Sequence, residues 1–138
     1  MRSARSLLLW FIAGCIGVLA GHQIVLMLLH DAGIASFAPF PMQPVEPFGV
    51  PQLVSITFWG GVWGIVLGLI APWFGRGLKY WILVALFGAV APTLIAVAVV
   101  FPMKGIELAG DPVMGLITGL SVNAAWGVVT AAARKAFR

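Results

Sequence analysis

The sequence predicts an all-α integral membrane protein with four transmembrane helices arranged as two hairpins. Of its 138 residues, 62% are apolar and 9% are charged, against about 45–50% and about 25% in soluble domains. Four apolar stretches are each long enough to cross a bilayer, and the charges between them sort by sign. This composition excludes an ordinary soluble enzyme, a disordered chain and a disulfide scaffold.

The four predicted helices cover residues 7–29, 52–72, 80–101 and 112–132. At about 1.5 Å per residue each covers about 30 Å, the thickness of the hydrocarbon core. None has Asp, Glu, Lys or Arg in its interior, and none alternates as the strands of a membrane β-barrel do. We expect residues 1–138 to form a single four-helix transmembrane domain.

The charged residues predict the topology. The N-terminus, the break at 73–79 and the C-terminus carry seven Lys or Arg and no acid, whereas the breaks at 30–51 and 102–111 carry one Lys and all four acids. The positive-inside rule makes the first group cytoplasmic, so we expect both termini inside and a bacterial-type inner (plasma) membrane. Interfacial aromatic residues agree with this expectation, since they flank the same breaks: Trp10, Trp73, Tyr80 and Trp81.

The first helix also resembles a targeting segment. Cys15 follows Ile12-Ala13-Gly14, which is similar to a bacterial lipoprotein signal box, and 18–20 is an acceptable signal-peptidase site. The apolar run covers 23 residues, whereas the core of a signal peptide has about 7–15. We therefore expect an uncleaved helix, with cleavage at either of these sites, or lipidation of Cys15, as the alternative.

The first external segment, residues 30–51, holds five of the nine prolines. Proline removes backbone donors and disfavours helix, so we expect an extended segment that lies over the outer ends of the helices.

Small residues recur at every fourth position in three helices, which places them on one helix face. Such seams allow helix backbones to approach closely in lipid, either within the chain or against a partner. The seam glycines are Gly17, Gly21, Gly60, Gly64, Gly68, Gly115, Gly119 and Gly127. Trp63-Gly64 and Trp126-Gly127 also suggest that the second hairpin repeats the first in the same orientation.

Few polar residues lie in or beside the predicted spans, and they are the candidates for a ligand-binding cluster. An ionisable group inside a membrane suggests function, but polar side chains also join helices by hydrogen bonds. Both readings stay open for these residues. The candidates are His22, Gln23, His30, Ser55, Thr57, Thr93 and Asn123.

The sequence lacks the motifs of several common kinds of functional site. No spacing suggests a metal site or a catalytic triad, and no pattern indicates nucleic-acid binding. We expect no cofactor and assign no catalytic residue. Both histidines lie on one predicted helix, so one chain cannot supply a facing haem-ligand pair, although a dimer could.

These observations favour a structural or accessory membrane protein that packs through its glycine seams with itself or with a larger complex. Its expected partners are membrane lipids and a homo-oligomer or complex; any small-molecule ligand is unidentified. The alternative is a small oligomeric transporter or channel with an outward-facing polar site, favoured by a helix kink at Pro92. A second alternative is an enzyme acting on lipid or quinone at the outer face, with His30, Asp31 and Glu46 as acid or base groups.

Overall fold

The computed structural model describes residues 2–107 and 110–137, and it confirms an all-α fold with four long apolar helices packed as a bundle. These helices are the candidate membrane spans: Ala4–Asp31, Gln52–Phe74, Gly77–Lys104 and Pro112–Ala136. Each extends a few residues beyond its predicted bounds at one or both ends. The predicted bounds followed hydrophobicity alone, whereas helical geometry continues into the polar caps.

Three spans change helix type along their length. The first comprises α1 (Ala4–Ile16), the π-helix η1 (Gly17–His22) and α2 (Gln23–Asp31). The second comprises α3 (Gln52–Ile70) and the 3₁₀ turn η2 (Ala71–Phe74). The third comprises α4 (Gly77–Ile95), the π-helix η3 (Ala96–Val100) and α5 (Phe101–Lys104). The fourth is a single helix, α6 (Pro112–Ala136).

Local chemistry explains several helix ends. Ser3 caps α1 by accepting a hydrogen bond from Ser6 N at 3.2 Å, and Asp111 caps α6 by accepting one from Val113 N at 2.8 Å. Pro112 occupies the first turn of α6. Backbone N–H groups in that turn have no acceptor within the helix, so proline, which lacks an N–H, is tolerated there. Gly105 ends α5 in the left-handed conformation (φ 62°).

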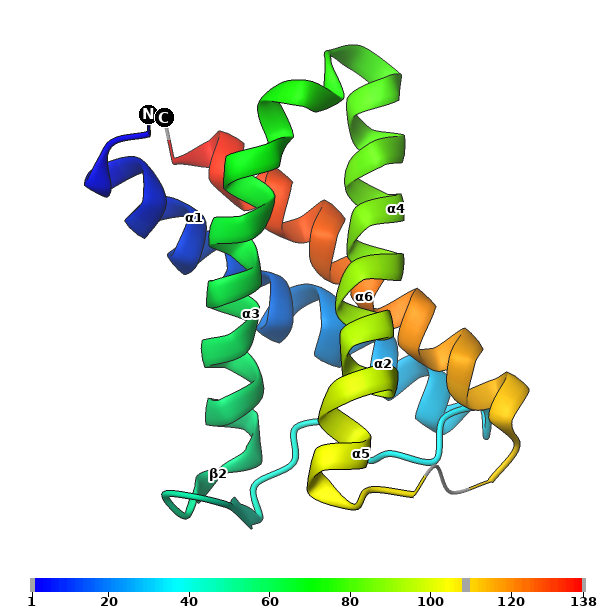
Figure 1. The fold of residues 1–138 in the computed structure, drawn as a ribbon. Coiled ribbons are helices and arrows are strands. Elements are labelled where there is room, and N and C mark those ends of the chain that lie inside the picture. The colour runs from blue at the N-terminus through cyan, green and yellow to red at the C-terminus, as the bar shows by residue number, and fades with distance from the viewer. Residues whose placement is uncertain (1, 108–109, 138) are drawn as a thin grey trace.

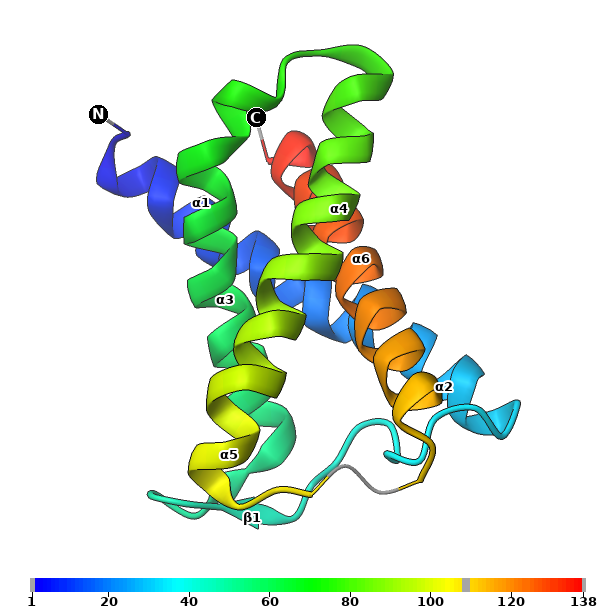
Figure 2. The ribbon, with the colours of Figure 1, turned by 45° about the vertical axis from the view of Figure 1, so that its right-hand side comes forward.

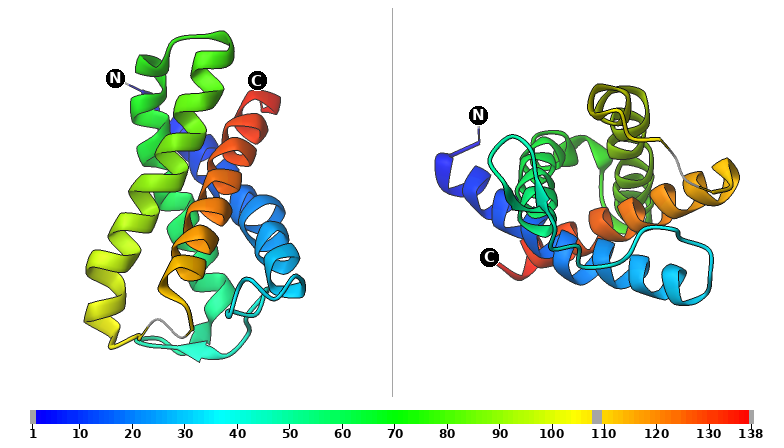
Figure 3. Two further views of the ribbon diagram at one scale, coloured as in Figure 1. Left: turned by 90° about the vertical axis from the view of Figure 1, so that its right-hand side faces the viewer. Right: turned by 90° about the horizontal axis from the view of Figure 1, so that it is seen from below.

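The helices form two hairpins that dock side by side (Figure 1). In the first hairpin α1 packs on α3, and in the second α4 packs on α6. Figures 2 and 3 show the α1–α2 helix beside an antiparallel α6 in one layer, with α3 and α4 in the other. The hairpins meet mainly through α1, η1 and α6, whereas α3 and α4 contact each other only over a short stretch. Both chain ends lie toward the end of the molecule that carries the α3–α4 turn.

The core lies where the two hairpins meet. Its buried residues come from all four spans and include Trp10, Leu67, Val84 and Trp126. Many large apolar side chains elsewhere on the helices are exposed, including Leu8, Leu28, Leu86 and Leu94. Such an exterior is expected when the surrounding solvent is hydrocarbon, because burial then brings no hydrophobic gain.

The proline-rich segment contains a small antiparallel hairpin of β1 (Pro44–Val45) and β2 (Val50–Pro51). Gly49 adopts a positive φ of 68° in its turn, a conformation that glycine takes without steric cost. Leu53 N donates to Pro41 O at 2.8 Å, which joins the segment to the first turn of α3. The segment crosses the end of the molecule opposite the chain termini (Figure 1).

Candidate functional site

The glycine seams lie at helix contacts inside the chain. A Cβ at Gly60 would collide with Val18 of η1, one at Gly64 would collide with α1, and one at Gly68 would reach the Trp10 ring. Gly17 and Gly21 abut α6, and Gly127 abuts α4, where its Cβ would lie 2.8 Å from Val84 O. Gly119 faces Thr93, whereas a Cβ at Gly115 would meet no atom within 4 Å. Seven of the eight predicted seam glycines are therefore used within one chain.

A tryptophan hydrogen bond joins the hairpins at the seam. Trp126 Nε1 donates to Gly14 O at 3.1 Å, from α6 to α1, and both groups are buried. The missing side chain at Gly14 allows α3 to approach so closely that a Cβ there would meet Gly60 O. Sequence analysis did not identify Gly14 as a seam residue, because it is out of register with the fourth-position series.

Gln23 ties the first span to the proline-rich segment. Its side chain has 0% exposure, its Oε1 accepts from Phe40 N at 2.6 Å, and its Nε2 donates to His22 Nδ1 at 3.1 Å. Phe40 adopts a φ of 49°, which is strained for an aromatic residue. The two predicted candidates His22 and Gln23 thus lie together, beneath a backbone that Gln23 holds in place.

Thr93 and Asn123 form a second polar pair, between α4 and α6. Asn123 Nδ2 donates to Thr93 Oγ1 at 2.9 Å, and Thr93 Oγ1 donates to Gly119 O at 3.1 Å. Thr93 is buried. The pair is satisfied by groups of the same chain, which is the hydrogen-bonding role of polar residues between membrane helices.

The remaining polar candidates are not joined to these pairs by any hydrogen bond between described residues. Thr57 Oγ1 donates to Leu53 O of its own helix at 2.7 Å, and Cys15 Sγ lies 3.5 Å from Thr57 O. Ser55 is half-buried on the same helix, α3. His30 Nδ1 donates to Ala35 O at 3.0 Å, closing the turn after α2. No hydrogen bond or ion pair between described residues joins His30, Asp31 and Glu46.

The basic residues cluster with aromatic rings at the end that carries the termini. The guanidinium carbons of Arg2 and Arg134 lie 5.8 and 5.7 Å from the Trp10 ring centre. Lys135 Nζ lies 4.3 Å from the ring centres of both Tyr80 and Trp81. Such cation–π contacts are stronger where water is excluded, so they hold the N-terminus, α4 and α6 together.

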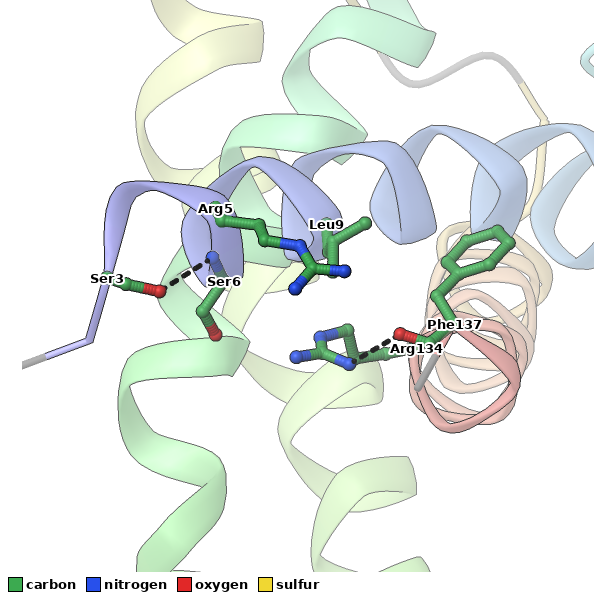
Figure 4. A pocket seen from close by; sticks show the side chains of 6 residues that line it. All are labelled: Ser3, Arg5, Ser6, Leu9, Arg134 and Phe137. Carbon is green, nitrogen blue, oxygen red and sulfur yellow. Dashed lines mark hydrogen bonds between the residues drawn. The ribbon is translucent and has the colours of Figure 1, made fainter.

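A hollow of about 170 Å³, the terminal hollow, opens beside this cluster (Figure 4). It lies between the first turns of α1 and the last turn of α6, and the guanidinium groups of Arg5 and Arg134 both point into it. Sequence analysis identified these cations but did not predict that they lie close together, because they are at opposite ends of the chain. Its lining residues are Ser3, Arg5, Ser6, Leu9, Arg134 and Phe137.

A second hollow, of about 200 Å³, lies at the opposite end of the molecule, between the turn after α2 and the start of α6. Asp111 is the one charged residue among the described residues that line it. Within residues 2–107 and 110–137, no group of three His, Cys, Asp or Glu is placed to hold a metal ion.

Comparisons with known proteins identify no relative. No protein-family model matches the chain, and no curated protein or solved structure matches it. The established result is therefore a four-helix, multi-pass membrane protein, and any finer role rests on its own geometry.

Proposed function

We propose that the protein is a structural or accessory membrane protein that acts by associating with another membrane protein or with a second copy of itself. The hydrogen bonding inside the bundle favours a structural role over a path for solutes. Gln23, Thr93 and Asn123, three of the polar candidates in the spans, are bonded to groups of the same chain. The seam glycines serve internal packing, so association requires another surface.

The observation that carries this proposal is the exposed aromatic face of α3. Phe58 and Trp59 are 52% and 57% exposed, and their rings meet edge to face at 5.5 Å. Trp59 follows the start of α3 by seven residues, about 10 Å at 1.5 Å per residue. Its indole N–H has no acceptor among the described residues. An unpaired donor at this depth is costly in hydrocarbon, and an acceptor from a partner helix would remove that cost.

Replacing Trp59 by Leu tests the proposal, with Trp73→Leu as the matched control. Trp73 is 79% exposed in η2, where an interfacial position suits tryptophan. The protein should be isolated at native expression in mild detergent and examined by native mass spectrometry. We expect a stoichiometric partner or dimer in the wild type and in Trp73→Leu, and its loss in Trp59→Leu. A monomer without partner in the wild type, or equal behaviour of both variants, would reject the proposal.

One observation favours the transporter alternative. Two spans contain π-helical segments, η1 and η3, and His22 lies in the first. Such segments are frequent at functional sites. Ion-flux measurements in proteoliposomes, with Na⁺, K⁺, H⁺ and Cl⁻ tested separately, would detect the activity. This alternative predicts flux that His22→Ala abolishes without changing assembly; absence of flux for all four ions, or normal flux in the variant, would count against it.

A further inference from the structure

We infer that the terminal hollow binds the phosphate group of an anionic phospholipid. The inference does not depend on the proposed association, because the hollow and the α3 aromatic face lie on different parts of the molecule. Its basis is two arginines, without acidic partners in the part of the chain that the structure describes, that converge on one hollow with both a polar and an apolar wall.

Among the described residues, no acidic group balances the positive charge around the hollow. All four acidic residues of the chain belong to the breaks at the opposite end, and no ion pair joins described residues. The side chain of Arg5 forms no hydrogen bond to a described residue. The side chain of Arg134 makes one hydrogen bond to a described residue, from its guanidinium to Phe137 O at 3.4 Å. Repulsion between these cations is relieved when an anion binds between them.

Arg134 supplies an independent sign of a missing acceptor. Its Nε is buried and has no hydrogen-bond partner among the described residues. A guanidinium offers five N–H donors and no acceptor, and a buried donor left unpaired costs free energy. Phosphate oxygens match the planar fork of arginine, so a phosphate in the hollow would use donors that the chain leaves free.

The lining favours an amphiphile over a fully polar anion. Leu9 and Phe137 form apolar walls beside the polar side chains of Ser3 and Ser6 (Figure 4). A volume of about 170 Å³ is several times the share of about 30 Å³ that one water takes in the liquid, so a phosphate group fits. Its glycerol and acyl portions would continue along the apolar walls into the surrounding lipid. The first turn of α1 adds the favourable field of a helix N-terminus.

Lipid binding by the full-length protein tests this inference. Native mass spectrometry should count lipids retained by the detergent-purified chain after addition of dioleoyl phosphatidylglycerol or, separately, dioleoyl phosphatidylcholine. The variants are Arg5→Gln and Arg134→Gln, and Arg76→Gln is the matched control because it removes a cation from the same end outside the hollow. Arg5 is exposed, so Arg5→Gln should fold, and circular dichroism checks the helix content of every variant.

We expect the wild type to retain one phosphatidylglycerol in preference to phosphatidylcholine. Removing Arg5 or Arg134 should weaken this binding about fivefold or more, whereas Arg76→Gln should leave it unchanged. Arg5→Lys should recover part of the affinity, since it restores charge without the planar fork. Equal binding of both lipids, or equal loss in all three glutamine variants, would overturn the inference. Displacement of the lipid by inorganic phosphate would also overturn it and assign the hollow to free phosphate.

Discussion

Gln23 shows how one buried side chain controls a distant segment. Its amide bonds the backbone of Phe40, 17 residues away, in a segment where five prolines remove backbone donors. The positive φ of Phe40 costs free energy, and it persists because surrounding contacts hold it. The sequence indicated that Gln23 was unusual for a span, but its partner lies in a segment without helical or strand periodicity.

Replacing Gln23 by Leu should therefore release residues 32–43 from the bundle. The change leaves Phe40 N without its acceptor, and the cost should be about 1–3 kcal/mol in unfolding free energy. Hydrogen–deuterium exchange should show faster exchange of the Phe40 amide. Gln43→Ala, at an exposed position in the same segment, is the control that should leave Phe40 protected. Unchanged exchange in Gln23→Leu would show that the bond does not hold the segment.

The Thr93–Asn123 pair should be energetically coupled, because each residue satisfies the other across the α4–α6 contact. A double-mutant cycle with Thr93→Val and Asn123→Ala should give a coupling energy of about 0.6 kcal/mol and at most about 1.7 kcal/mol, the average and maximum from such cycles in a membrane protein. Unfolding in mixed micelles of mild detergent and dodecyl sulfate provides the measurement. Additive single effects would mean that the two residues stabilise the helices independently.

Glycine positions determine how the four helices pack. Gly64 packs on Gly14 in the first hairpin, and Gly127 packs on Gly88 in the second. The tryptophan before each, Trp63 or Trp126, contacts the other hairpin: Trp63 meets Phe87 at 6.0 Å, and Trp126 bonds Gly14. The sequence repeat thus has a structural counterpart, although α1 and α6 pack closely whereas α3 and α4 contact each other only over a short stretch.

Gly64→Ala and Gly115→Ala should have opposite effects on stability. A Cβ at Gly64 collides with α1, whereas one at Gly115 meets nothing within 4 Å. We expect Gly64→Ala to destabilise the fold by about 1–3 kcal/mol through overpacking. Gly115→Ala should be neutral or stabilising by up to about 1 kcal/mol, because alanine is the better helix former. The same micelle unfolding measurement compares them, and equal effects would contradict the packing described here.

The whole molecule has one basic end and one acidic end. The chain termini and the α3–α4 turn lie together, and the proline-rich segment lies opposite (Figure 1). This arrangement agrees with two hairpins that cross the bilayer in the same orientation. The side on which each end lies follows from charge, and we predict that the basic end is cytoplasmic.

Cysteine labelling measures this orientation directly. In a Cys15→Ala background, which removes the single native cysteine, Arg76→Cys and Gln43→Cys place thiols at opposite ends. A membrane-impermeant maleimide applied to intact spheroplasts should label Gln43→Cys and should label Arg76→Cys only after lysis. The reverse pattern would invert the topology, and labelling of both in intact cells would contradict the two-sided arrangement.

Hydrophobicity and charge along the sequence determined the positions of the four spans and the division of the breaks into basic and acidic groups. Both are local properties, because the preference of each residue for lipid or water depends mainly on its own side chain. Only the tertiary structure decided which surfaces meet. Trp126 and Gly14 bond across 112 residues, and Asn123 and Thr93 across 30. Arg5 and Arg134 converge on one hollow because α1 and α6 run antiparallel. In lipid, close packing and hydrogen bonds select among possible helix contacts, and those depend on three-dimensional fit rather than on any pattern along the chain.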